Sequence, residues 1–74
     1  MQFFLLHLRN GVPGVLKFVG DEWNEAVVTA KEILKNQTLI GAKVKDNEED
    51  WDDCFDDGYF ELEDGNMVYF LSSE

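Results

Sequence analysis

The chain has 74 residues, of which 16 are Asp or Glu and six are Lys or Arg, so its formal net charge is −10. This length allows one domain with one small core, and a hydrophobic content of 45% is too high for a disordered chain. The negative charge excludes binding to nucleic acid or anionic membranes by charge attraction, because phosphates would repel such a surface. We therefore expect a folded acidic protein with no direct nucleic-acid or membrane partner.

The first nine residues include an apolar run that has to be compared with targeting signals. No basic residue precedes the run, His7 interrupts it, and no small-residue cleavage site follows it. No apolar stretch approaches the roughly 18 residues that a membrane span requires. Cys54 is the single cysteine and cannot form a disulfide within the chain. These features favour a reducing, cytoplasmic location.

The charge is divided unevenly between the two parts of the chain. Residues 1–45 hold four acids and six bases, a net charge of +2, whereas residues 46–74 hold 12 acids and no base, a net charge of −12. Neither part has enough apolar residues for a core of its own, so the asymmetry does not mark two domains. We interpret residues 1–74 as a single acidic domain.

The N-terminal segment predicts a β-hairpin with strands over residues 3–9 and 15–19. Asn10-Gly11 suits a type I′ turn and Val12-Pro13-Gly14 suits a type II turn, and the sequence leaves both open. Both strands carry apolar residues on two faces. The set expected to face the core is Phe4, Leu6, Leu8, Leu16 and Phe18, and the set expected on the opposite face includes Phe3, Leu5, Val15 and Val19.

The next segment predicts one amphipathic helix over residues 22–35, capped by Asp21 and stopped near Asn36. A third strand is expected over residues 38–45, because apolar and polar residues alternate there. The apolar stripe of the helix consists of Trp23, Ala26, Val27, Ala30, Ile33 and Leu34.

The C-terminal segment predicts a second hairpin, with strands over residues 59–63 and 67–71. A two-residue Asp64-Gly65 loop would pair Leu62 with Met67. A three-residue loop over residues 63–65, with Gly65 in the left-handed bulge position, pairs Phe60 with Val68 instead. The hydrophobic pattern favours the bulged loop. It gathers Phe60, Leu62, Val68 and Phe70 on the core face and Tyr59, Glu61, Met67, Tyr69 and Leu71 on the other.

The segment over residues 46–58 has two interpretations, since eight of its 13 residues are acidic. It is either a solvated loop or a short helix of one to two turns. The helix would begin after Asn47 and end at Gly58, and its first turn is acidic, as the helix dipole favours. Its three apolar residues, at i, i+3 and i+4, are Trp51, Cys54 and Phe55.

The abundant carboxylates do not form a recognised calcium loop. The best alignment starts at Asp53 and places Gly58 at position 6 and Asp64 at position 12. It places Phe55 at position 3, where an oxygen ligand is required. We therefore expect no specific metal site.

No arrangement of residues predicts catalysis. Cys54 has acidic neighbours that disfavour its thiolate, and His7 is the single histidine, expected to border the more polar face of the first strand. Phosphate-binding glycine loops and zinc-ligand spacings do not occur. We expect a protein that is not an enzyme and has no cofactor.

Together these elements predict an α+β fold: a β-β-α-β-connector-β-β chain whose mainly antiparallel sheet of about five strands packs on one amphipathic helix. A single helix cannot cover both faces of such a sheet. Either the acidic segment folds back over the other face, the sheet curls strongly, or a partner or second copy covers that face.

The leading functional hypothesis is an inhibitor that mimics nucleic acid and occupies the basic groove of a nucleic-acid-handling protein. Phage and mobile-element proteins that block host defence nucleases have this acidic profile, by analogy of class alone. The expected partner-binding strip is Asp46, Glu48, Glu49, Asp50, Asp52, Asp53, Asp56, Asp57, Glu61 and Glu63.

Two alternatives remain. One is an immunity or antitoxin-type protein that binds a single basic toxin. The other is a structural adaptor that forms a homodimer through the apolar sheet face, with its acidity incidental to function.

Overall fold

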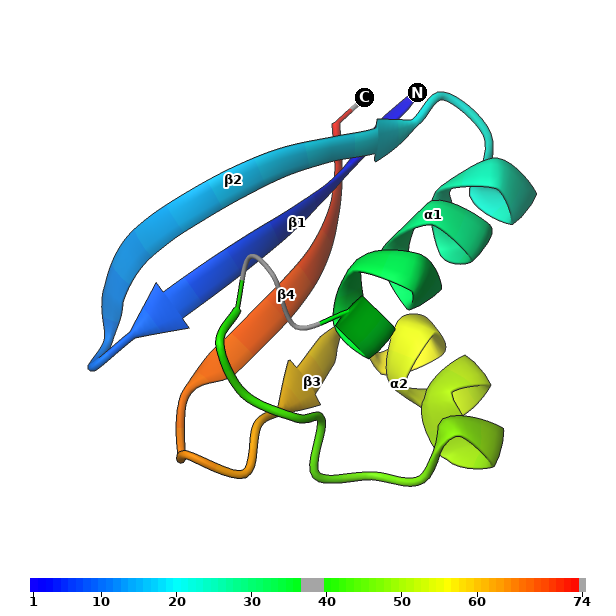
Figure 1. The fold of residues 1–74 in the computed structure, drawn as a ribbon. Helices are drawn as coiled ribbons and strands as arrows, with labels where there is room; N and C mark the ends of the chain where they lie inside the picture. Colours follow the sequence, from blue (N-terminus) through cyan, green and yellow to red (C-terminus); the bar gives the residue numbers. More distant parts are fainter. Residues whose placement is uncertain (37–39, 74) are drawn as a thin grey trace.

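The computed structural model describes residues 1–36 and 40–73, which form a four-stranded antiparallel sheet with two α-helices against one face (Figure 1). The strand order is β2-β1-β4-β3, so the two central strands come from opposite ends of the chain. The elements are β1 (Gln2–Arg9), β2 (Val12–Gly20), α1 (Trp23–Asn36), the 3₁₀ helix η1 (Glu48–Asp50), α2 (Trp51–Asp57), β3 (Tyr59–Glu61) and β4 (Met67–Ser73). The expected α+β class is confirmed, and the count of about five strands is corrected to four in the described residues.

A two-residue turn closes the N-terminal hairpin. Asn10 and Gly11 have φ angles of 53° and 78°, and Arg9 lies opposite Val12. Positive φ at both central residues defines a type I′ turn, which matches the twist of the flanking strands. Of the two turns left open by the sequence, the Asn-Gly turn is therefore the one that forms.

In the N-terminal hairpin, the face expected to be exposed is packed against the core, and the face expected in the core is exposed. Phe3, Leu5 and Val19 are buried beneath the helices, whereas Leu16 and Phe18 are 60% and 46% exposed. Because both faces of these strands are apolar, alternation alone could not identify the core face. The expected assignment of faces was wrong for this hairpin.

Pairing with β4 sets the correct orientation. Leu5 lies opposite Phe70 and His7 lies opposite Val68, so β1 shares its inner face with the buried side of the C-terminal hairpin. His7 is accordingly buried rather than at a polar border. We call the opposite, helix-free side the outer face, and its residues are Phe4, Leu6, Leu8, Leu16, Phe18, Met67, Tyr69 and Leu71.

The helix α1 packs on the inner face through the predicted stripe. Ala26, Ala30 and Leu34 are buried. Trp23 stays partly exposed, yet its ring meets the edge of Phe70 at a centroid distance of 5.4 Å. This helix was predicted to within one residue at each end.

The expected third strand does not form in its described part. Gly41 has a φ of 67°, a left-handed conformation that breaks an extended strand. One bridge, between Val44 and Leu62, is all that remains of the ladder. The alternation still identified the buried side correctly, since Ile40 is buried and Val44 is half-buried. Residues 38–39 of the predicted strand lie outside the described residues.

The C-terminal hairpin has the predicted bulged loop. Phe60 lies opposite Val68, and the backbone N–H of Leu62 donates to the carbonyl of Asn66 at 2.9 Å. Gly65 has a φ of 88°, as the bulge position requires. The N–H of Asn66 donates to the Asp64 carboxylate at 2.9 Å, and this bond holds the pKa of Asp64 below its ordinary value. The predicted core face of this hairpin is confirmed.

The acidic segment is helical, which settles the choice between loop and helix. A turn of 3₁₀ helix leads directly into α2, and Gly58 ends it with a φ of 91°, its N–H bonded to the carbonyl of Cys54. Phe55 meets the rings of Phe60 and Phe70 at centroid distances of 4.8 and 4.9 Å. These aromatic contacts fix α2 to the inner face of the sheet.

Candidate functional site

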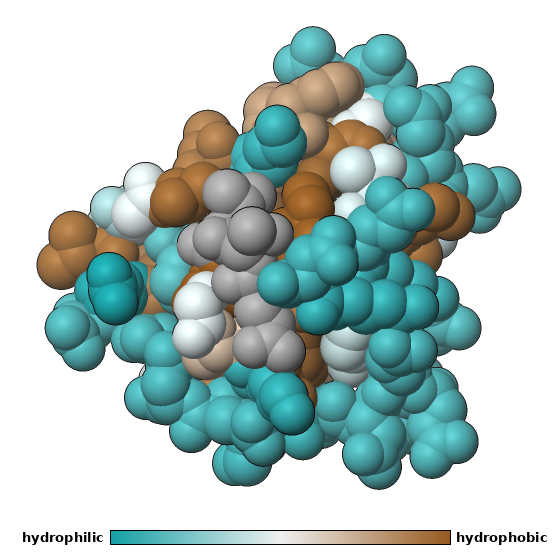
Figure 2. All heavy atoms as spheres, in the orientation of Figure 1, coloured by the Kyte–Doolittle hydropathy of each residue, from teal (hydrophilic) through white to brown (hydrophobic). Residues whose placement is uncertain are grey.

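The carboxylates of the acidic segment are displayed on the outside of η1 and α2. Trp51 and Phe55 point to the core and are buried, so the residues between and beside them face solvent. Figure 2 shows hydrophilic residues across the lower right of the molecule, where η1 and α2 lie. The apolar residues at helical spacing therefore determine which way the acids point.

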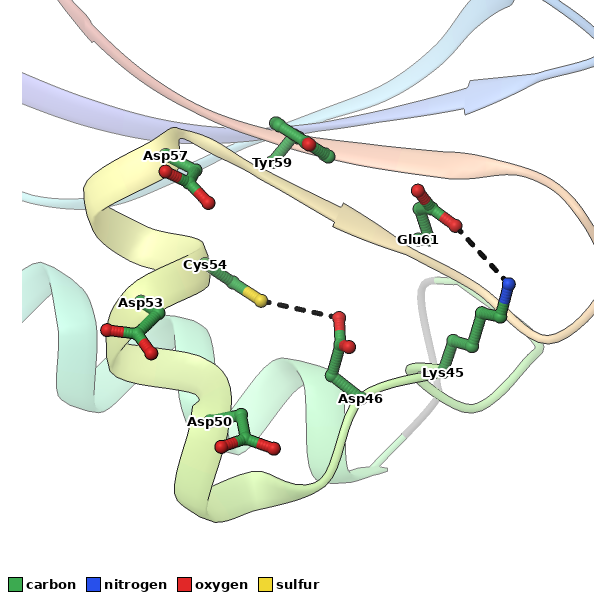
Figure 3. A pocket seen from close by; sticks show the side chains of 8 residues that line it. All are labelled: Lys45, Asp46, Asp50, Asp53, Cys54, Asp57, Tyr59 and Glu61. Carbon is green, nitrogen blue, oxygen red and sulfur yellow. Dashed lines mark hydrogen bonds and ion pairs between the residues drawn. The ribbon is translucent and has the colours of Figure 1, made fainter.

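One side of α2 borders a shallow hollow of about 390 Å³, which we call the acidic hollow. It lies between α2, the start of β3 and the segment that leads into η1 (Figure 3). Five carboxylates, one lysine, one thiol and one phenol line it. The lining residues are Lys45, Asp46, Asp50, Asp53, Cys54, Asp57, Tyr59 and Glu61.

Local geometry brings these residues together from three segments. Asp50, Asp53 and Asp57 recur at helical spacing along one side of η1 and α2. Gly58 then turns the chain sharply, and its carbonyl accepts a 2.9 Å hydrogen bond from the N–H of Phe70, which places β3 beside the helix. The backbone bond from Lys45 N–H to the Glu61 carbonyl, at 2.8 Å, closes the third side.

Positive charge in the acidic hollow comes from Lys45, whose Nζ lies 3.6 Å from a carboxylate oxygen of Glu61. Both side chains are more than half exposed, so the pair is weak and easily screened. The remaining four carboxylates make no ion pair with any residue that the structure describes. The acidic hollow therefore keeps a strong negative potential.

The side of α2 that faces α1 has a different environment, and we call it the α1 flank. Lys31 Nζ lies 3.1 Å from Asp52 Oδ1, and Lys35 Nζ lies 3.5 Å from Glu48 Oε2. Both lysines are in the second half of α1, so the basic part of the chain partly neutralises this flank. Seven of the ten predicted strip residues are thus divided between two surfaces, five in the acidic hollow and two on the α1 flank.

Three residues of the predicted strip belong to neither group. Glu49, Asp56 and Glu63 are exposed, and none makes an ion pair within residues 1–36 and 40–73. Three lining residues of the hollow were not in the predicted strip: Lys45 and Tyr59, and Cys54, which was expected only on the apolar side of the helix. For Lys45 and Tyr59, position in the chain was the available signal, because they flank the acidic segment on its two sides.

Cys54 faces the hollow as a protonated thiol. Its Sγ donates to Asp46 Oδ2 at 3.4 Å. Burial raises the pKa of Cys54 to about 11, and the hydrogen bond to Asp46 and the negative charges of Asp57 and Asp53 add to the effect. At neutral pH this thiol is a poor nucleophile.

His7 lies on the other side of the molecule's core, against Leu5 and Val68 on the inner face. Its Nε2 is buried and has no hydrogen-bond partner among the residues that the structure describes. Cys54 and His7 sit on different elements and face different surroundings, so the structure does not bring them together as a nucleophile and base.

In residues 1–36 and 40–73 no group of three or more His, Cys, Asp or Glu side chains is placed to hold a metal ion. Neither described α-helix is long and apolar enough to cross a membrane.

Comparison with protein-family models, curated proteins and solved structures finds no match for this chain.

Proposed function

We propose that this chain is a non-enzymatic, cytoplasmic inhibitor that mimics nucleic acid and occupies the basic groove of a nucleic-acid-handling protein. The observation that carries the proposal is the acidic hollow, where five carboxylates are opposed by Lys45 alone among its lining residues. A surface of this kind attracts a basic partner over a long range and repels nucleic acid itself.

The spacing of charge supports this proposal. Seven carboxylates occur in the ten residues of η1 and α2. At the rise of 3₁₀ and α-helices these residues span roughly 16 Å, or about one charge per 2.3 Å. Duplex DNA carries about one phosphate per 1.7 Å of its axis. Two of the seven, Glu48 and Asp52, are paired with lysines on the α1 flank. The other five are the carboxylates that a groove built to neutralise phosphates would meet.

The rigidity of the display adds to the argument. Trp51 meets Phe60 at a centroid distance of 6.0 Å, and its Nε1 donates to the carbonyl of Asp46 at 3.1 Å. The same residue therefore ties the start of the acidic segment to the core. Carboxylates held in place before binding lose little conformational entropy when the partner arrives.

The first test is capture with competitive elution. The chain is immobilised, a lysate is applied, and bound proteins are eluted with duplex DNA or RNA at constant ionic strength. We expect nucleic-acid-handling proteins to be released, because both ligands occupy one groove. A single basic protein that resists both competitors would overturn the proposal and favour the immunity-type alternative.

The second test uses variants of equal charge. The hollow variant is Asp50→Asn/Asp53→Asn/Asp57→Asn, and the control variant is Glu48→Gln/Asp52→Asn/Asp56→Asn, whose sites lie outside the hollow. Each removes three charges, so general attraction to a basic partner falls equally. We expect the hollow variant to bind the captured protein at least about 30-fold more weakly and the control variant less than about fivefold. Equal losses would show that the acidic hollow is not the binding site.

A further inference from the structure

The outer face of the sheet is apolar across β2, β1 and β4. Phe18, Phe4 and Leu71 lie opposite one another across β2, β1 and β4, and the rings of Phe4 and Phe18 are 5.7 Å apart. The neighbouring rows repeat this composition. They consist of Leu16, Leu6 and Tyr69, with Tyr59 of β3 at the margin, and of Pro13, Leu8 and Met67.

This composition is unusual for a face in contact with water. An antiparallel sheet with one solvated face normally carries polar residues on that side. Both α-helices lie on the inner face, and no described segment covers the outer one. Leu16, Phe18 and Leu71 are among the most exposed large apolar residues of the protein. Contiguous apolar patches of this kind mark association surfaces.

The size of the outer face is near the lower limit for a specific interface. The eight residues of β1 extend for about 26 Å, and the three long strands β2, β1 and β4, spaced about 4.8 Å apart, are roughly 14 Å wide, which gives roughly 360 Å² in projection. Two such faces total roughly 720 Å² in projection, and the accessible surface over protruding side chains is larger. Specific interfaces begin at about 1,000 Å² of buried accessible surface.

The distribution of charge identifies the occupant. The protein has a net charge of −10, yet the outer face bears no charged residue apart from Glu61 at its β3 corner. A basic partner finds no complementary charge there. An uncharged apolar surface is complementary to itself, as an interface with two-fold symmetry requires. Its burial also removes almost no carboxylate from water.

We propose that two copies of this chain associate through their outer faces to form a symmetric dimer. The two sheets pack face to face at about 10 Å, with their apolar rows interdigitated. The acidic surfaces of η1 and α2 stay outside the interface, so the dimer presents the acidic hollow twice. This inference does not depend on the proposed function, because it uses a different kind of contact and a surface that shares only its margin, Tyr59 and Glu61, with the acidic hollow.

The test is sedimentation equilibrium of the purified chain with no other protein present. We expect a dimer of two 8.5 kDa chains whose dissociation is not promoted by high salt, since apolar burial drives the contact. Leu16→Lys/Phe18→Lys should raise the dimer dissociation constant at least about 100-fold. These substitutions remove apolar contact and place lysines of both copies in the interface, where their desolvation and mutual repulsion also oppose association.

Two further variants keep the result interpretable. Val28→Lys, at an exposed apolar site on α1, changes the charge similarly and should leave the dimer intact. Leu71→Lys tests the same face from β4 if the β2 variant does not fold, as judged by circular dichroism. A monomeric parent chain, a dimer that survives the outer-face substitutions, or equal weakening by Val28→Lys would overturn the proposal.

Discussion

The two sides of α2 carry the same kind of charge and differ in what opposes it. On the α1 flank, Lys31 and Lys35 reach across from the neighbouring helix to Asp52 and Glu48. On the side of the acidic hollow, Lys45 reaches Glu61 and the other four carboxylates stay unopposed by described residues. Two of the three lysines that pair with these acids are therefore on the α1 flank, and one is at the acidic hollow. The sequence shows that this segment is acidic. Which of its sides has the stronger negative potential depends on where the folded chain places the lysines.

The largest expected effect comes from removing the contact that holds α2 in place. Phe60 is fully buried and packs against the rings of both Trp51 and Phe55. Phe60→Ala should lower the free energy of unfolding by about 3–5 kcal/mol, measured by urea denaturation. It would also loosen α2 and so remove the difference between its two sides.

The neighbouring residue supplies the control for this prediction. Tyr59 is 41% exposed, and Tyr59→Ala should cost less than about 1 kcal/mol. A loss in Phe60→Ala as small as that of the control would contradict the aromatic anchoring of α2.

The next effect concerns the reactivity of Cys54, which reports first the burial of its thiol and then the hydrogen bond to Asp46 and the negative charges of the acidic hollow. A pKa of about 11 against an ordinary value of 9.0 leaves roughly 100-fold less thiolate at pH 8. Iodoacetamide should therefore alkylate the native chain about 100-fold more slowly than the urea-unfolded chain. Asp46→Asn should accelerate the reaction, whereas Asp52→Asn on the α1 flank should not.

The raised pKa of Cys54 also makes the stability of the folded chain depend on pH. The folded chain binds the Cys54 proton more tightly than the unfolded chain, so stability falls as pH rises from about 9 toward about 11. Equal alkylation rates in the native and unfolded chains would contradict this assignment.

The smallest expected effect is that of salt on thermal stability. Raising NaCl from about 0.01 to about 0.15 M shortens the Debye length from about 30 to about 8 Å and screens exposed charges. We expect the melting temperature to rise by a few degrees, equivalent to less than about 1 kcal/mol. The hollow variant should show a smaller rise than the control variant, because its substitutions remove unopposed repulsion. A melting temperature that is flat or falls with salt would mean that the acids are already compensated.

The fold was predictable where one face of an element differs clearly from the other. In the C-terminal hairpin, the bulged loop was the choice that placed the apolar residues on one face of the sheet. Gly65 could adopt the positive φ that the bulge position requires. In the N-terminal hairpin both faces are apolar, so pairing with β4, which the sequence does not reveal, decides the orientation. Gly41 ended the expected third strand because a left-handed residue overrides the alternation around it.

The sequence was sufficient to locate the acidic segment. It was not sufficient to tell which other residues lie beside that segment on the folded surface. The apolar spacing of Trp51 and Phe55 determined which residues face solvent. It could not show that Lys31, 21 residues away in the chain, opposes Asp52. Nor could it place Glu61 beside α2, because that depends on how β3 turns at Gly58. The spacing of apolar residues in a helix predicts which side chains are exposed. The electrostatic potential around those side chains depends on charged residues that are distant in sequence.

The order of the strands also bears on how the chain is synthesised. β1 is synthesised nearly 60 residues before β4, yet the two pair at the centre of the sheet. Until residues 67–73 emerge, the β1–β2 hairpin has only one neighbour and exposes apolar side chains on both faces. Nascent chains in this condition depend on rapid completion or on chaperones to avoid misassociation. Translation must therefore pass β4 before the four-stranded sheet can be completed.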